Sequence, residues 1–203
     1  NIAFSPDGQR IASVSDDGRV KLWEIGGELV ASFEHSQQAV EALAFSPDGQ
    51  YIVAGGQDRQ LKLWSINERS AIVLGEHQDS IRTVAFSPDG NIIASGSWDQ
   101  TIRLWSPDGR HLQTFVSHTA PLTQLAFSPD GETLASADFH GEVKLWKVKN
   151  RFFTVLSGHQ DNVRATVFTP DHQQVFSSSW GGEVYRWDMQ GNLLGSLEGH
   201  DQG

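Results

Sequence analysis

Hydrophobic and polar residues alternate along this chain in short runs that are separated by turn-forming residues. Between positions 80 and 116 four such runs follow one another, at 80–86, 91–97, 101–105 and 111–116. In the third run Ile102 and Leu104 fall on one face of an extended strand and Arg103 and Trp105 on the other, because side chains alternate along a strand. Runs and turns this short leave no room for an ordinary helix. The pattern predicts four antiparallel β-strands.

The turns between these runs have a sequence that favours chain reversal. Ser87, Pro88 and Gly90 suit positions i, i+1 and i+3 of a type I turn, since proline presets one φ angle and glycine relieves crowding. The same four letters return at 106–109, before the fourth run. Each unit is therefore expected to be a four-stranded antiparallel sheet.

The unit recurs along the whole chain with a period of 41 residues. FSPDG or its variant FTPDH begins at Phe4, Phe45, Phe86, Phe127 and Phe168. A tryptophan follows each phenylalanine by 19 positions, at Trp23, Trp64, Trp105, Trp146 and Trp187. Histidines precede the later copies at His35, His77, His118 and His159. A period of roughly 40 to 45 residues is typical of propeller blades with four strands.

Composition changes this picture little. The 203 residues contain no cysteine, which rules out a disulfide framework and is compatible with a reducing, cytoplasmic compartment. The net charge is −10 and no run of Lys and Arg is present, so nucleic acid is not an expected partner. No apolar run approaches the roughly 20 residues that cross a bilayer, so no membrane partner is expected.

The repeated features together resemble the WD-repeat β-propeller family, and among its members the bacterial FSPDG-type arrays that are attached to larger signalling proteins. These features are a loop histidine, small residues in the second strand, an aspartate six positions before a tryptophan, and that tryptophan itself. The resemblance implies an all-β propeller of five four-stranded blades, at about 1–34, 35–75, 76–116, 117–157 and 158–198, in one segment of 1–203. Because related rings usually have seven blades, we expect a part of a larger ring; a closed five-bladed ring and assembly between chains are the alternatives.

The resemblance also implies a hydrogen-bonded network in each blade. The third copy supplies His77, Ser95, Asp99 and Trp105, although Ser97 lies on the same strand face as Ser95. The first and second copies supply Ser13, Asp17, Trp23, His35, Asp58 and Trp64, with Ala54 at the serine position. The fourth and fifth supply His118, Ser136, Trp146, His159, Ser177 and Trp187. Since His140 and Gly181 stand at their aspartate positions, we expect these two blades to be less firmly held.

A set of His, Asp and Ser also suggests hydrolysis, but a catalytic triad needs one exposed nucleophile, whereas this set recurs once per repeat. Zinc needs ligands that converge on one point, whereas the repeated histidines stand one per blade. We therefore expect no enzyme, no metal site and no cofactor.

Positions that differ between copies are the candidates for partner binding. The residue before each turn aspartate position is Asp16, Gln57, Trp98, Phe139 and Trp180 in chain order. Four positions before each later phenylalanine stand Glu41, Arg82, Thr123 and Arg164. In the family both sets lie on the face of the second-to-third-strand turns, the latter at the mouth of the channel. Aromatic rows with polar neighbours are typical of interface hot spots.

These positions predict a non-catalytic scaffold that binds a protein or peptide on this turn face. The alternative is that these residues have no binding role, in which case each aromatic ring covers its own blade and the arginines are solvated charges at strand ends. A carbohydrate-binding propeller is the rival from another class, because exposed tryptophans also stack on sugars. Self-association is expected if the ring is open, since an open arc exposes apolar faces of its end blades.

Overall fold

The computed structural model describes residues 1–116, 118–150 and 152–197, and these residues form twenty β-strands without a helix. Blade 1 comprises β1 (Ile2–Phe4), β2 (Arg10–Val14), β3 (Arg19–Glu24) and β4 (Leu29–Glu34). Blade 2 comprises β5 (Val40–Phe45), β6 (Tyr51–Gly56), β7 (Gln60–Ser65) and β8 (Ser70–Glu76). Blade 3 comprises β9 (Ile81–Phe86), β10 (Ile93–Ser97), β11 (Thr101–Trp105) and β12 (His111–Val116). Blade 4 comprises β13 (Leu122–Phe127), β14 (Thr133–Asp138), β15 (Val143–Lys147) and β16 (Phe153–Leu156). Blade 5 comprises β17 (Val163–Phe168), β18 (Gln174–Ser179), β19 (Val184–Asp188) and β20 (Leu193–Leu197).

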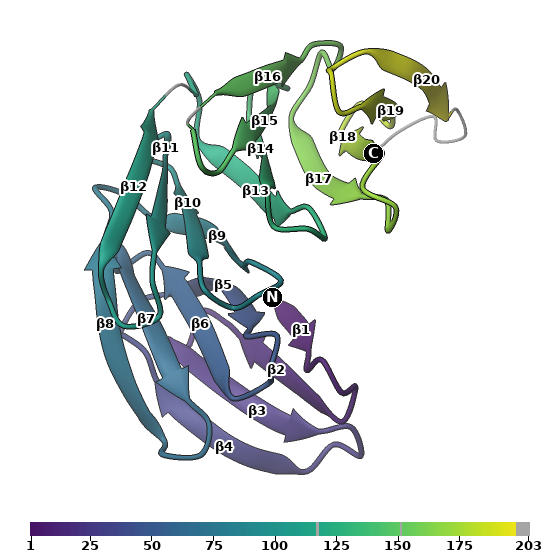
Figure 1. Cartoon of the computed structure of the whole chain (residues 1–203). Helices are drawn as coiled ribbons and strands as arrows, with labels where there is room; N and C mark the ends of the chain where they lie inside the picture. Colours follow the sequence, from purple (N-terminus) through teal and green to yellow (C-terminus); the bar gives the residue numbers. More distant parts are fainter. Residues whose placement is uncertain (117, 151, 198–203) are drawn as a thin grey trace.

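Every blade is an antiparallel sheet whose four strands pair in chain order. The first strands β5, β9, β13 and β17 pack side by side from blade to blade, and β1 contacts β5. Figure 1 shows the blades fanned into an open arc, with the first strands towards its middle and the fourth strands at its rim. The expected all-β propeller architecture is confirmed.

The Ser-Pro-Asp-Gly turns fold through their own side chains. In blade 3 the Gly90 amide donates to the Ser87 carbonyl at 2.9 Å, and the Gly90 φ of +73° lies in the left-handed region. The Ser87 hydroxyl donates to Asp89 Oδ1 at 2.6 Å, and the same oxygen accepts the Asn91 amide. Equivalent bonds form in every blade, and in blade 5 His172 takes the left-handed position. These turns hold each first hairpin at one end of its blade.

An apolar cluster fills each of the four boundaries between successive blades. Trp64, Trp105, Trp146 and Trp187 each contribute to one of them from the third strand. The apolar residues of one blade that face the next recur mostly with the 41-residue period, so the boundaries are similar to one another. Burial against a neighbouring blade, and not within one sheet, therefore provides the core.

The two end faces of the arc differ from each other. In blade 1 Ile2, Phe4 and Ile25 are 66%, 61% and 55% exposed, although the residues at the same positions of blade 2, Leu43, Phe45 and Ile66, are buried. In blade 5 the outward face carries exposed Arg186 at the position of four buried leucines, Leu22, Leu63, Leu104 and Leu145. The face of blade 1 thus retains the composition of a blade boundary, whereas that of blade 5 is mixed.

Candidate functional site

The blade 3 network joins four side chains, which come from the strands β10 and β11, the turn between them and the loop before β9. His77 Nδ1 lies 2.9 Å from Asp99 Oδ2, and His77 Nε2 lies 2.8 Å from Ser95 Oγ. Because a carboxylate only accepts, the proton lies on Nδ1, and the Ser95 hydroxyl donates to Nε2. Trp105 Nε1 donates to the same Ser95 oxygen at 2.9 Å. Ser97 has another role, since its hydroxyl donates to the Asp79 carbonyl and accepts the Asp99 amide.

Burial and hydrogen bonding shift the pKa values of this network. Burial lowers the pKa of His77 and outweighs the opposing effect of Asp99. Burial alone would raise the pKa of Asp99, but hydrogen bonds from His77, from Thr101 and from the Gln78 amide hold it well below its usual range. The pair is therefore a neutral imidazole beside a carboxylate, and its fully buried Ser95 has no access to a substrate.

Blades 1 and 2 carry partial versions of this network. In blade 1 Trp23 Nε1 donates to Ser13 Oγ at 2.9 Å, while the hydrogen bond from Lys21 lowers the pKa of Asp17 to about 2. In blade 2 Ala54 provides no hydroxyl, and among the described residues Trp64 Nε1 and both ring nitrogens of buried His35 have no hydrogen-bond partner. Asp58 lies 3.6 Å from His35 Nε2.

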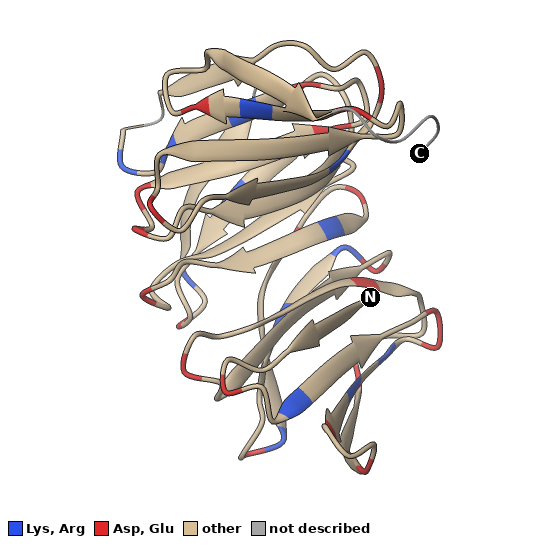
Figure 2. Cartoon of the chain, turned by 90° about the vertical axis from the view of Figure 1, so that its right-hand side faces the viewer, with Lys and Arg blue, Asp and Glu red and all other residues tan. Residues whose placement is uncertain are grey.

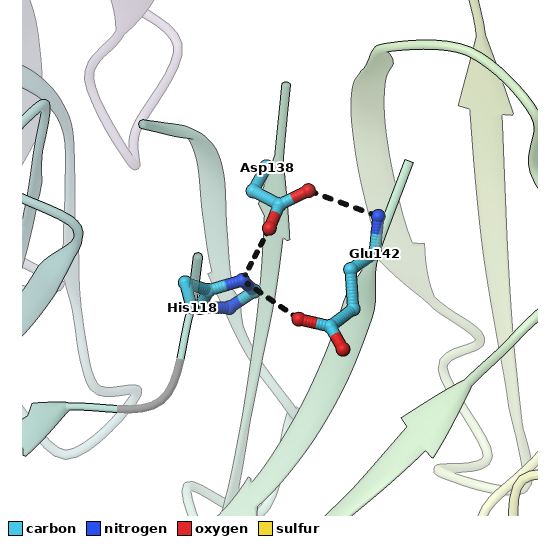
Figure 3. Close-up of side chains that lie close together, drawn as sticks. All are labelled: His118, Asp138 and Glu142. Atoms are coloured by element: carbon cyan, nitrogen blue, oxygen red, sulfur yellow. Dashed lines mark hydrogen bonds and ion pairs between the residues drawn. The ribbon is translucent and has the colours of Figure 1, made fainter. Parts of the chain in front are cut away.

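Blade 4 is tied by a carboxylate that the sequence interpretation did not assign. His118 Nδ1 lies 2.9 Å from Asp138 Oδ2, and His118 Nε2 lies 2.6 Å from Ser136 Oγ, which accepts Trp146 Nε1. Figure 3 shows that the other Asp138 oxygen accepts the Glu142 amide. We expected blade 4 to be less firmly held because His140 stands at its aspartate position. That reason is wrong, because Asp138, two positions earlier at the end of β14, provides the carboxylate.

In blade 5 the carboxylate comes from a further position. His159 Nε2 lies 2.7 Å from Ser177 Oγ, which accepts Trp187 Nε1 at 2.8 Å. Glu183 Oε2 lies 3.6 Å from His159 Nδ1, too far for a hydrogen bond, and Tyr185 stacks on the imidazole at 4.4 Å between ring centroids. Burial lowers the pKa of His159. Gly181 contributes no side chain, so this blade has the longer contact between His159 and Glu183 in place of a hydrogen-bonded aspartate.

One cluster has the donor types of a metal site. The potential ligand atoms of His118, Asp138 and Glu142 lie within 4.8 Å of one another (Figure 3). Lys144 Nζ, however, lies 2.5 Å from Glu142 Oε2, and its ammonium packs over the Phe153 ring. The positive charge that a cation would supply is already present, and His118 also belongs to the blade network. We interpret the cluster as structural.

The aromatic residues of the turns lie on the opposite end of the blades from the Ser-Pro-Asp-Gly turns. Trp98 and Trp180 are 42% and 58% exposed, and Phe139 is half-buried. The rings of Trp98 and Phe139 meet edge to face at 6.2 Å between centroids. Arg82 lies over the Trp98 ring at 5.5 Å, and Arg164 over the Trp180 ring at 5.0 Å. We call Trp98, Phe139 and Trp180 the aromatic arc.

A polar cavity of about 180 Å³ adjoins the arc on its inner side, lined among others by Glu41, Arg82, Thr123, Phe139 and Arg164. Arg82 is held by Glu41 at 2.8 Å, and Glu41 also accepts the Ser80 hydroxyl and the Gln57 amide. Among the described residues Arg164 has no carboxylate within ion-pair distance. Asp16, exposed on blade 1, does not line this cavity. The cavity therefore presents the Arg164 guanidinium, which has no ion-pair partner among the described residues, beside Phe139.

Comparison with protein families agrees with this architecture. Residues 1–203 match the family model of the first beta-propeller of IFT122. The chain belongs to this family. The resemblance to WD-repeat β-propellers is thereby confirmed, and domains of this kind generally mediate protein interactions and are typically not catalysts. A comparison with curated proteins gives no match. Within the described residues no helix has the length and apolar character needed to cross a membrane.

Proposed function

We propose that this propeller is a non-catalytic interaction domain that binds a protein or peptide on the turn face, through the aromatic arc and the adjoining polar cavity. The observation that carries the proposal is the Trp98–Phe139 edge-to-face pair, which stays partly exposed beside Arg82. Turn residues have no structural need for large rings, and exposed aromatic side chains next to arginine are typical of interface hot spots. The lack of cysteine is compatible with a cytoplasmic setting.

The charges of the cavity favour an acidic ligand group. Glu41 already neutralises Arg82, whereas Arg164 lies over Trp180 without a carboxylate among the described residues. A carboxylate of the partner would form a charge-assisted hydrogen bond with Arg164 while an apolar side chain packs on the rings. We therefore propose a partner segment that combines an acidic residue with an aromatic or aliphatic one.

The rival function is carbohydrate binding, because tryptophan rings also stack on sugars. A repeated sugar site needs similar polar groups beside each ring. Here Asp99 and Gln100 follow Trp98, whereas Gly181 and Gly182 follow Trp180. Asp99 is further occupied by His77 and Thr101. The unequal neighbours favour a protein or peptide partner.

A selection experiment separates these functions. A phage-displayed random dodecapeptide library is panned against the domain, and the same protein is applied to a glycan array. We expect acidic peptides with aromatic or aliphatic residues, whose binding is lost when Arg164 is replaced by Ser. Glu132→Ser, an exposed change on the opposite end of blade 4, is the matched control. Glycan binding that depends on Trp98 and Trp180 would instead support the lectin function.

A further inference from the structure

A second recessed surface lies between blades 2 and 3, far from the aromatic arc. Two cavities of about 380 and 290 Å³ share Tyr51, Leu63 and Pro107 as lining residues. Because antiparallel strands alternate in direction, the β5–β6 and β11–β12 turns that border these cavities lie at the opposite blade end from the turn that carries Trp98. We call the surface formed by Tyr51, Leu63, Ile72 and Pro107 the blade 2/3 groove.

The groove has a cause in the sequence. Pro107 stands where blades 2, 4 and 5 place Ile66, Val148 and Met189, and these three pack into the boundary with the preceding blade. Proline presents a shorter side chain and has no amide to donate, whereas the Ile66 amide donates to the Gln50 carbonyl at 3.0 Å. The apolar cover of the boundary is therefore missing at blade 3.

The consequence is visible on the facing blade. Ile72 of β8 is 47% exposed, whereas Ala31 at the equivalent position of blade 1 is 9% exposed and lies within its boundary cluster. Tyr51, at the start of β6, is also exposed. The floor of the groove is thus apolar surface of a kind that the boundary between blades 1 and 2 covers, where Ala31 and Ile66 lie in one buried cluster.

Carboxylates surround this apolar floor. Asp48, Glu68, Asp89 and Asp108 line the two cavities, and no Lys or Arg is among the described lining residues. Hydrogen bonds from serine hydroxyls hold the pKa values of Asp48, Asp89 and Asp108 below their usual range, so these groups are ionised at neutral pH. Arg110 pairs with Asp108 at 2.9 Å. Figure 2 shows acidic residues gathered in such turns at the ends of the strands.

We propose that the blade 2/3 groove binds an extended peptide segment whose large apolar side chains are flanked by lysine or arginine. The cavity volumes are near the lower end of the roughly 300–1,000 Å³ typical of ligand pockets, which suits side chains more than a cofactor. The negative rim complements the cations of such a segment and repels acidic ones. The groove and the aromatic arc therefore select peptides of opposite charge at opposite ends of the blades.

The test uses the same kind of dodecapeptide library, panned on the intact domain and eluted with synthetic basic peptides. Recovered peptides are expected to be rich in Lys or Arg and in Leu, Phe or Trp. Pro107→Ile, which restores the residue type of blade 2, should fill the groove and weaken their binding at least about tenfold, as for loss of a central anchor. Val148→Ile, the same kind of filling at the next boundary, should leave binding unchanged.

Two further variants make the result decisive. Ile72→Asn removes the exposed floor side chain without altering the turn, so it replaces Pro107→Ile if that variant does not fold. Glu68→Lys should weaken binding and reduce its salt dependence. Replacing the aromatic arc should have no effect on these peptides, which separates this proposal from the function of the turn face. Recovery of only acidic peptides, or equal binding by wild type and Pro107→Ile, would overturn the proposal.

Discussion

At the scale of single residues, the loop histidines of blades 3, 4 and 5 each lie within hydrogen-bond distance of a second-strand serine, whereas the nearest carboxylate comes from a different position in each of these blades. The carboxylate belongs to a turn residue in blade 3, Asp99, and to the last residue of a strand in blade 4, Asp138. In blade 5 it belongs to Glu183, the residue before β19. A buried imidazole N–H needs an acceptor, and more than one backbone position can deliver it.

The buried aspartates should therefore matter more than the turn residue that was expected to replace one of them. Asp99→Ala and Asp138→Ala each leave buried donors unpaired and should lower the free energy of unfolding by about 1 to 3 kcal/mol. His140→Ala, at an exposed position, should cost less. Urea unfolding of the three variants measures this order. Equal losses for Asp138→Ala and His140→Ala would contradict the assignment of Asp138.

Blade 2 offers the converse experiment, a gain of stability. Ala54 stands where Ser95 accepts Trp105 Nε1 in blade 3, and Trp64 Nε1 lacks a partner among the described residues. Ala54→Ser should supply the missing oxygen and raise the free energy of unfolding by about 1 kcal/mol. Ser95→Ala is the matched change in the complete network and should destabilise. A fall in the melting temperature of Ala54→Ser would show that the site has no room for the hydroxyl.

Most of this hydrogen-bonded network, but not all of it, could be predicted from the sequence alone. The tryptophans, histidines and second-strand serines follow the 41-residue period, so register alone located them, including Ser95 and Ser136. Register also fixed the aspartate at one position, which misplaced the carboxylate of blade 4. Asp138 and Glu142 each stand two positions from His140, and the sequence does not show which of the two carboxylates hydrogen-bonds to His118.

At the scale of elements, a blade is a sheet whose network couples folding to pH. Burial lowers the pKa of His77 and of His159, while their unfolded values are near the usual 6.5. Between the folded and the unfolded pKa values the unfolded chain binds more protons than the folded one. The contribution of these two histidines to the free energy of unfolding is therefore fully present above about pH 6.5 and is lost as the pH falls. The lowered pKa values of Asp58, Asp99 and Asp138 take effect only below the ordinary range of aspartate.

We therefore expect the free energy of unfolding to decrease between about pH 7.5 and pH 5.5, in a window set by these histidines. His77→Gln and His159→Gln should be less stable at the higher pH but should depend less steeply on pH. Urea titrations at both pH values, for the wild type and each variant, measure the slopes. A wild-type stability that is constant or rises over this window would contradict the neutral, buried state of both imidazoles.

The strands themselves were predictable because turn signals bound every one of them, and the blade order follows from their short connections. The blade 2/3 groove was not, although its cause is one letter. Pro107 reads as an ordinary turn residue, and only the neighbouring blades show that an apolar side chain belongs at that position.

At the scale of the whole molecule, the arc has an exposed end face that resembles an interior one. Ile2, Phe4 and Ile25 of blade 1 correspond to buried residues of blade 2, namely Leu43, Phe45 and Ile66. Contiguous apolar surface of this kind is typical of association sites. The face of blade 5 differs because it carries Arg186, so two copies of the 203-residue chain should associate through their blade 1 faces in a symmetric pair.

Sedimentation velocity over a dilution series should show this association, with the weight-average sedimentation coefficient rising with concentration. Phe4→Asp together with Ile25→Asp should leave a monomer. Val116→Asp, at an exposed position on the rim strand of blade 3, should not change the association. A wild type that stays monomeric at every concentration, with a sharp thermal transition, would contradict the open arc and favour a closed form.

The central claim is that the aromatic arc binds a partner and is not part of the core, and isothermal titration calorimetry of an acidic peptide from the library selection tests it most directly. The triple variant Trp98→Ala, Phe139→Ala and Trp180→Ala should bind at least about a hundredfold more weakly, since central aromatic anchors contribute ~2 kcal/mol or more each. Its melting temperature should stay close to that of the wild type. Unchanged affinity, or a variant that no longer folds, would contradict the claim.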